Sequence, residues 1–257
     1  MKRLLAIALL VCGGLHAVET DNFSDLLDLV DNDCLLVCDI DNTLIRPAQY
    51  LGSTNWSWSY VKKLESHGLS REDALAEMNA QMKPILLCSK TELVDQRIPS
   101  VIADLQVRGA RVMGYTSRDP HWGFVTTDAL RGVGIDLTLT APCCSVDDEA
   151  KSDFIEGVLL TDGLAEKGQE LARFLEGMEK LPRRVVIVDD RNKSLQKTLW
   201  AIQDAGIDVE VVGVWYRAGE EWYRNFDPQL TEIQLTHFGR IISDEDALKL
   251  LEANLSE

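Results

Sequence analysis

The sequence predicts an α/β fold, a doubly wound parallel sheet with a small, mostly helical insertion after its first strand. Apolar runs without helical periodicity recur, as in "CLLVCDI" (34–40) and "RRVVIVDD" (183–190), and such runs are typical of strands covered on both faces. Segments with helical patterns lie between them, and this alternation favours a parallel sheet. The 257 residues, 46% of them hydrophobic, suffice for one α/β domain with an insertion or for two small domains.

The N-terminus has the pattern of a signal peptide. Lys2 and Arg3 precede an apolar stretch that includes Val11, and Ala17 is a plausible cleavage position. We therefore predict a signal peptide over residues 1–17 and a secreted or periplasmic protein, with an uncleaved anchor as the alternative. The apolar stretch is short for a bilayer span, and no later segment resembles one, so we expect no integral membrane span in the mature chain.

The first strand, 34–40, is followed by an interruption of the strand and helix rhythm. We interpret residues 45–97 as an inserted domain. It opens with an irregular aromatic stretch, "QYLGSTNWSWSY" (49–60), and continues with a helix near "SREDALAEMNAQM" (70–82). Ser70 stands three residues before Asp73, which resembles a capping box with Asp in place of the usual Glu.

The core domain is expected to comprise residues 18–44 and 98–257. After the insertion, "IPSVIADLQVRG" predicts a helix opened by Pro99 and closed by Gly109, and "ARVMGYTS" predicts a second buried strand that ends at Thr116. The later elements are predicted as a helix at 123–134, a strand at 135–140, a hairpin at 153–163 with "TDG" as its turn signal, a helix at 165–180 and strands at 183–190 and 209–216.

Charge and cysteine content limit the partners. The chain has 42 acidic and 26 basic residues, a formal charge of -16, and no Lys/Arg run beyond its first three residues. Nucleic acid and anionic membrane surfaces are therefore poor partners. An anionic substrate stays possible, because a metal ion or a single lysine can hold a phosphate.

We interpret Cys34 and Cys38 as small apolar residues of a buried strand, with a disulfide as the alternative.

Polar residues stand where the predicted strands stop. Asp39 and Asp41 end the first strand, Thr116 ends the second, and Asp189 and Asp190 end a later one. In open α/β sheets, ligands bind at the carboxyl ends of the strands. The fold would therefore bring these side chains to one edge of the sheet.

These residues resemble the motifs of the haloacid dehalogenase-like (HAD) superfamily, most of whose members are phosphohydrolases. The stretch "LGSTNW" is similar to a secreted bacterial branch of that superfamily whose substrate is unknown. The resemblance implies a HAD-like Rossmannoid core with a cap domain at residues 45–97. The matches span residues 35–215 and consist of Asp39, Asp41 and Thr43 for D-x-D-x-T, Thr116 for the second motif, Lys167 in "AEKGQEL" for the third, and Asp189 with Asp190 for the fourth.

The chemistry of these residue types fits the resemblance. Asp39 would attack phosphorus to form an aspartyl phosphate, and Asp41 would act as general acid and base. Two carboxylates facing a phosphate need a divalent cation, and Mg²⁺ suits oxygen ligands. The resemblance implies that Mg²⁺ is held by the Asp39 carboxylate, the Asp41 backbone carbonyl and the fourth-motif acids, with Asp190 preferred over Asp189.

Four further residues are candidates for binding the phosphate group of a substrate, Thr116, Ser117, Arg118 and Lys167. By resemblance, Thr116 and Lys167 would hold the non-bridging phosphate oxygens. Lys151 competes for the lysine position, but it precedes the predicted hairpin, whereas the family's lysine enters the helix after it. Ser117 and Arg118 directly follow the second motif as further phosphate-binding candidates, and Arg118 has the alternative role of pairing with an acid.

Aromatic residues of the insertion are candidates for reading the leaving group. Trp56 and Trp58, with Tyr60 nearby, lie where a cap would cover the site, and cap domains exclude water and contact substrate. The alternative is that these rings pack the insertion onto the core.

The sequence thus predicts an exported, Mg²⁺-dependent phosphatase of a small phosphorylated metabolite. Phosphonate or haloacid hydrolysis uses the same scaffold, but an acid two residues after the nucleophile suits an alkoxide leaving group. A phosphomutase is a further alternative. An alternative of a different class is a catalytically idle binding protein exported to the envelope or host. The presence of Asp39, Asp41, Lys167 and the acidic pair argues against this alternative.

Overall fold

The computed structural model describes residues 16–142, 154–161, 167–237 and 242–254. The chain forms two compact units, each described here by itself. The core unit comprises Met1–Leu44 and Val94–Gly219, and the helical unit comprises Ile45–Leu93 and Glu220–Glu257. The sequence predicted that residues 220–257 belong to the core domain, whereas the structure groups Glu220–Glu257 with the insertion.

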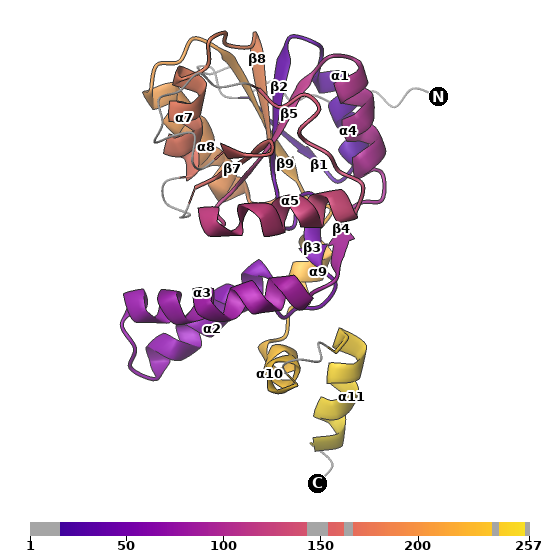
Figure 1. The fold of residues 1–257 in the computed structure, drawn as a ribbon, viewed down its shortest axis with the longest axis vertical. Coiled ribbons are helices and arrows are strands. Elements are labelled where there is room, and N and C mark those ends of the chain that lie inside the picture. Colours follow the sequence, from indigo (N-terminus) through magenta and orange to yellow (C-terminus); the bar gives the residue numbers. More distant parts are fainter. Residues whose placement is uncertain (1–15, 143–153, 162–166, 238–241, 255–257) are drawn as a thin grey trace. The chain divides into compact units, whose positions relative to one another are not determined.

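The core unit is built on a seven-stranded sheet with the order β1-β9-β8-β2-β5-β7-β6 (Figure 1). Among the described strands, neighbours run parallel except β6 and β7. This confirms the predicted α/β class with a mostly parallel sheet. The strands are β1 His16–Thr20, β2 Cys34–Asp39, β5 Arg111–Thr116, β6 Phe154–Ile155, β7 Val158–Leu160, β8 Arg184–Asp189 and β9 Glu210–Tyr216.

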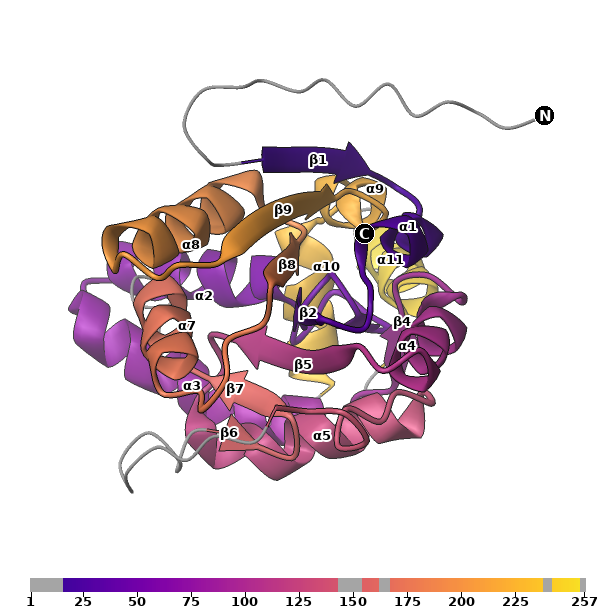
Figure 2. The same ribbon diagram turned by 90° about the horizontal axis from the view of Figure 1, so that it is seen from above.

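Helices cover both faces of this sheet (Figure 2). On one face, α7 (Lys167–Glu176) and α8 (Asn192–Asp204) bury a cluster that includes side chains from β2, β5 and β8. The other face carries α1 (Leu26–Leu29) and α4 (Ile98–Val107), while α5 (Gly123–Gly132) packs against β6 and β7. All six residues of β2 are buried, as expected for a strand covered on both sides.

Two sequence predictions about local structure were wrong, and a third was confirmed in part. Residues 135–140 form an irregular segment that ends in a turn at 138–140 instead of a strand, because the Asp136 side chain accepts the backbone N–H of Thr138 at 2.9 Å. The predicted hairpin forms, but its two strands are joined at Glu156 and Gly157, both with positive φ. Of the expected turn "TDG", Asp162 and Gly163 lie outside the described residues. Part of the stretch predicted to be irregular, 49–60, is helical.

That helix is α2 (Thr54–Ser66) of the helical unit, and it begins at an N-cap, since Ser53 Oγ accepts the N–H of Trp56 at 3.1 Å. The helix predicted near 70–82 is confirmed as α3, where Ser70 Oγ accepts the N–H of Asp73 at 3.1 Å. The unit's elements are β3 Ile45–Pro47 and β4 Thr91–Leu93, which pair antiparallel, with α2, α3 Arg71–Cys88, α9 Glu220–Arg224, α10 Pro228–Thr236 and α11 Asp244–Asn254.

Hydrogen bonds join the insertion to the C-terminal segment within the helical unit. The N–H of Tyr50 donates to Asp244 Oδ1 at 3.0 Å, and the N–H of Leu51 donates to Gln234 Oε1 at 3.0 Å. Tyr50 also packs against the rings of Trp222 and Phe226. These contacts explain why the C-terminal helices belong to this unit.

Most of the predicted signal peptide lies outside the described residues, which begin at His16. His16 and Ala17, the last two residues of that segment, pair with Val212 and Gly213 in the parallel ladder between β1 and β9. Cys34 and Cys38 are buried free thiols of β2, in agreement with the interpretation as apolar core residues. None of the described helices combines the length and apolar character that a membrane crossing requires.

Candidate active site

The first motif lies where β2 stops and the chain turns away. Asn42 has a φ of 63°, in the left-handed region that Asn tolerates better than most residues. The turn brings Thr43 back under the strand end, where its Oγ1 donates to Asp39 Oδ2 at 2.9 Å and accepts the N–H of Asp190 at 3.1 Å. Thr43 therefore joins the end of β2 to the residue that follows β8.

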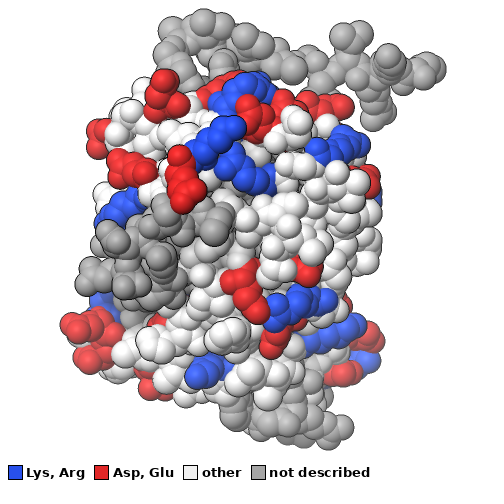
Figure 3. Space-filling model, turned by 45° about the horizontal axis from the view of Figure 1, so that its top comes forward, with Lys and Arg blue, Asp and Glu red and all other residues white. Residues whose placement is uncertain are grey.

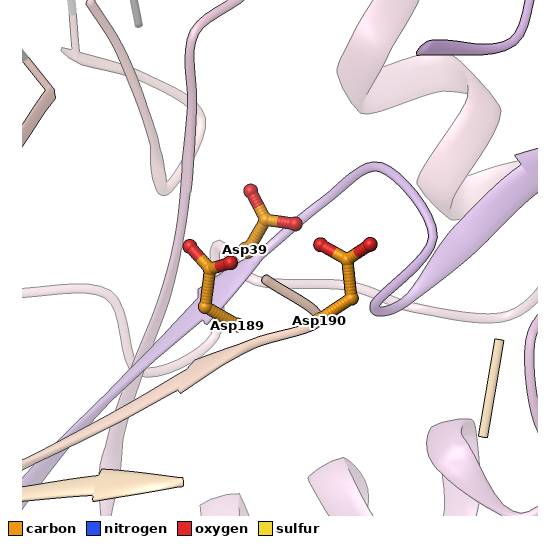
Figure 4. Close-up of side chains that lie close together, drawn as sticks. All are labelled: Asp39, Asp189 and Asp190. Atoms are coloured by element: carbon orange, nitrogen blue, oxygen red, sulfur yellow. The ribbon is translucent and has the colours of Figure 1, made fainter. Parts of the chain in front are cut away.

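Three buried carboxylates meet at this point, those of Asp39, Asp189 and Asp190 (Figure 4). One oxygen from each lies within 4.8 Å of the others. Burial raises the pKa of Asp39 to about 7 despite the opposing charge of Lys167. The pKa of Asp190 is held well above its ordinary value, mainly because the carboxyl group is buried and secondly because the charges of Asp39 and Asp189 repel its charged form. The cluster thus carries the unfavourable electrostatics that a bound cation would relieve.

Lys167, the first residue of α7, reaches into the same cluster. Its ammonium forms an ion pair with Asp39 Oδ1, lies 3.4 Å from Asp189 Oδ2 and sits 3.7 Å from the centroid of the Tyr115 ring. Burial alone would lower the pKa of Lys167, but Asp39, Tyr115 and Asp189 together hold it well above its ordinary value. Lys167 is therefore a buried lysine whose neighbours favour its charged form. The competing Lys151 lies outside the described residues.

Asp189 is surrounded by donors, and Asp190 is not. Asp189 Oδ1 accepts the N–H of Arg191 at 2.9 Å, and its Oδ2 accepts the Ser194 hydroxyl at 2.9 Å and the Tyr115 hydroxyl at 3.3 Å. Within the part of the chain that the structure describes, no hydrogen bond reaches the Asp190 carboxylate. Asp190 is therefore better placed than Asp189 to offer an oxygen to a metal.

Asp41 and the second motif form a neighbouring group. Arg118 binds the Asp41 carboxylate through two hydrogen bonds, Nη2 to Oδ1 at 2.7 Å and Nε to Oδ2 at 3.0 Å. Thr116, buried at the end of β5, accepts the N–H of Arg118 at 3.2 Å, and its hydroxyl lies 3.5 Å from Asp41 Oδ2. Ser117, half-buried, directly follows β5. Of the two roles left open for Arg118, the structure shows pairing with an acid.

Trp56 lies in the helical unit, where it is buried and stacks on Tyr60 with a centroid distance of 5.2 Å.

Tyr115 and Thr198 were missed by sequence reasoning. The Tyr115 hydroxyl lies 3.0 Å from Thr198 Oγ1, behind the carboxylate cluster. Both residues read as ordinary core positions, and no local pattern distinguishes them.

The comparisons with known proteins bear on the whole chain. A family described as "Protein of unknown function (DUF2608)" matches residues 19–248. The chain belongs to this family. A relative from Chlamydia pneumoniae is 25% identical over 226 residues, which cover 82% of this chain and 81% of that protein. One from Chlamydia trachomatis serovar D is 22% identical over 244 residues, covering 95% and 90%.

Both of these relatives are named "Putative outer membrane protein". A third, "Uncharacterized protein RP296" from Rickettsia prowazekii, is 24% identical over 252 residues, covering 92% of this chain and 89% of its own. No solved structure matches the chain. The family is therefore shown, and the activity must be argued from the site.

Proposed function

We propose that this protein is a Mg²⁺-dependent phosphomonoesterase of the HAD-like type that works through an aspartyl phosphate on Asp39. The observation that carries the proposal is the meeting of Asp39, Asp189, Asp190 and Lys167 at the carboxyl ends of β2 and β8. A purely structural ion pair does not need two further buried carboxylates beside it. Perturbed carboxylates clustered around one lysine are typical of catalytic sites.

The donor set fits Mg²⁺. It consists of carboxylate oxygens, of which those of Asp39 and Asp190 would hold the ion together with the backbone carbonyl of Asp41. When bound, Mg²⁺ would offset the charge of the substrate phosphate and of the carboxylates. Asp190→Asn should therefore remove the rise in melting temperature that Mg²⁺ gives the wild-type protein. An unchanged rise would exclude Asp190 as a ligand.

Asp39 has the surroundings that a carboxylate nucleophile requires. Lys167 holds its Oδ1 and Thr43 its Oδ2, and each oxygen keeps a second lone pair. One oxygen would attack phosphorus, and the resulting acyl phosphate would be hydrolysed in a second displacement. The Lys167 ammonium and the Thr116 hydroxyl would stabilise the charge on the transferring phosphoryl oxygens.

Asp41 completes the proposal as the acid and base. It stands two residues beyond Asp39, and its side chain is 28% exposed, so an ester oxygen can approach it. It would protonate the leaving oxygen and later take a proton from the attacking water. Small phosphorylated metabolites with alkoxide leaving groups are the substrate class that needs such an acid.

The test is phosphate release from a panel of about a hundred phosphorylated metabolites, with Mg²⁺, with chelator, and with Asp39→Asn. We expect release that needs both the metal and Asp39, with losses of at least about 10³-fold when either is removed. Arg173→Met, on the exposed side of α7, serves as a control that should keep full activity. Silence of the folded, metal-loaded wild-type protein on the whole panel would favour the alternative, an idle binding protein of the envelope or host.

We also propose export to the envelope or beyond. The basic and apolar start of the chain and the names of the chlamydial relatives support this. We keep the proposal that nucleic acid is not a partner, and the mixture of Lys and Arg with Asp and Glu side chains on the face shown in Figure 3 supports it. Fractionation of cells expressing the tagged chain would test export, and retention in the cytoplasm would contradict it.

A further inference from the structure

The guanidinium of Arg118 has a hydrogen-bond partner on each of its three nitrogens. Nε and Nη2 donate to the two oxygens of Asp41, and Nη1 donates to Thr126 Oγ1 at 3.1 Å. Two parallel bonds between a planar guanidinium and a carboxylate fix both the separation and the relative plane of the two groups. The pair is therefore a geometric restraint on Asp41 as well as a charge interaction.

Arg118 is the fixed partner of this pair. Its side chain is 9% exposed, against 28% for Asp41. Thr126, which holds Nη1, lies on α5 and donates its own hydroxyl proton to the carbonyl of Trp122 at 2.9 Å. The backbone N–H of Arg118 is held by Thr116 Oγ1. An arginine anchored at its backbone and at the far end of its side chain has little freedom to follow a substrate.

We propose that Arg118 is a positioning residue that orients Asp41 toward the leaving oxygen, and not a direct phosphate ligand. This inference rests on the proposed phosphatase function. The paired nitrogens occupy one lone pair on each Asp41 oxygen, and the Thr116 hydroxyl faces the second lone pair of Oδ2 at 3.5 Å. Oδ1 is thus the oxygen that keeps a lone pair free to carry the proton. Without the pair, the carboxyl group of Asp41 could rotate about its χ2 torsion, because the energy of that torsion varies little over a broad range of angles. Its proton would then no longer point toward the leaving oxygen.

The proton moves in two balanced steps. In the first, an Asp39 oxygen forms a bond to phosphorus while the bond from phosphorus to the ester oxygen breaks, and the proton of Asp41 passes to that oxygen. In the second, water attacks phosphorus, Asp41 takes a proton from the water, and the bond between Asp39 and phosphorus breaks. Misdirection of Asp41 affects the first step only when the leaving oxygen needs a proton.

The leaving group therefore distinguishes the two roles of Arg118. An aryl oxide such as p-nitrophenolate leaves without protonation, whereas an alkoxide such as that from glycerol phosphate does not. We would measure kcat and KM on both compounds for the wild type, Arg118→Met, Arg118→Lys and Asp41→Asn. Arg118→Lys keeps the positive charge but lacks the planar guanidinium that donates two parallel hydrogen bonds to one carboxylate. It provides a second test of the same role if Arg118→Met fails to fold.

Arg131→Met is the matched control. Arg131 lies on α5, pairs with Asp128 through one nitrogen and with Glu156 through another, and takes no part in the site. Binding of inorganic phosphate in the presence of Mg²⁺, measured by calorimetry, provides a readout that does not depend on turnover. All variants would be compared after confirming their circular dichroism and melting temperatures.

A positioning role predicts that both Arg118 variants lose about 10²-fold in kcat/KM on glycerol phosphate and less than about tenfold in kcat/KM on p-nitrophenyl phosphate, with Kd for inorganic phosphate within about twofold of wild type. The comparison uses kcat/KM because it reports the step in which the leaving group departs, whereas kcat also includes the hydrolysis step that both compounds share. The double variant with Asp41→Asn should lose no more than Asp41→Asn alone. Equal losses on both compounds, with phosphate binding weakened tenfold or more, would overturn the inference and leave the phosphatase intact. A wild-type protein silent on both compounds would overturn the proposed function, and the inference with it.

Discussion

Asp39→Asn, studied without metal, probes the electrostatics of the carboxylate cluster. Burial raises the pKa of Asp39 to about 7 from its ordinary 3.8, and Lys167 only partly offsets this. Between these two values the folded protein keeps a proton that the unfolded chain releases. Stability is therefore lost as the pH rises through this window, and the loss is complete above a pH of about 7.

The magnitude follows from the linkage relation. Each pKa unit corresponds to about 1.4 kcal/mol, so the whole difference amounts to about 4 kcal/mol, of which somewhat more than half falls between pH 5 and pH 8. Asn cannot ionise and lacks this dependence. The stability of Asp39→Asn relative to wild type, measured as the free energy of unfolding, should therefore be about 2–3 kcal/mol greater at pH 8 than at pH 5.

Urea unfolding in chelator at both pH values measures this difference. Asp128→Asn provides the control, because that carboxylate is 72% exposed and should show little change in its stability relative to wild type. Adding Mg²⁺ at about a hundred times its Kd should restore about 2.7 kcal/mol to the wild type and little to Asp39→Asn. A difference that stays constant from pH 5 to pH 8 would refute the claim that burial keeps Asp39 protonated in the metal-free protein.

Three further substitutions test other parts of the structure. Lys167→Met should cost about 3–5 kcal/mol in urea unfolding at pH 8, because it leaves buried carboxylates without their cation, and a cost below about 1 kcal/mol would contradict the buried pair. Gly114→Ala should lower stability by about 1–3 kcal/mol, since a Cβ there would lie 2.7 Å from Ile40 Cδ1; an unchanged melting temperature would contradict this packing. Trp56→Ala should cost about 3–5 kcal/mol if the ring serves packing, whereas a raised KM at unchanged stability would show substrate contact.

The strand ends of the core were predictable from the sequence because two local features coincide there. A strand buried on both faces must be apolar throughout, so the first polar residue marks its end, as Asp39 and Asp189 do. Parallel strands place those ends on one edge. The same reasoning failed at 135–140, where Ile135 and Leu137 are buried although they lie in a segment without regular structure, and their alternation with polar residues resembles that of a strand.

The helical unit was less predictable for a different reason. The stretch containing Trp56 is rich in Ser, Asn and aromatic residues, which are modest helix formers, and the N-cap at Ser53 together with burial of Trp56 outweighs that preference. The grouping of the C-terminal helices depends on contacts such as that between Tyr50 and Asp244, 194 residues apart in the chain. Nothing local in either segment indicates the other.

The charges at the site explain why metal dependence should be strict. Asp39, Asp41, Asp189 and Asp190 face Lys167 and Arg118, which are each paired with a carboxylate, and the exposed Arg191, whose charge acts to lower the pKa of Asp190. A phosphate dianion would therefore approach a site in which carboxylates outnumber cations, and its own charge would add to the repulsion that, after burial, raises the pKa of Asp39 and Asp190. The arrangement that destabilises the metal-free protein is the same one that makes a divalent cation necessary for substrate binding.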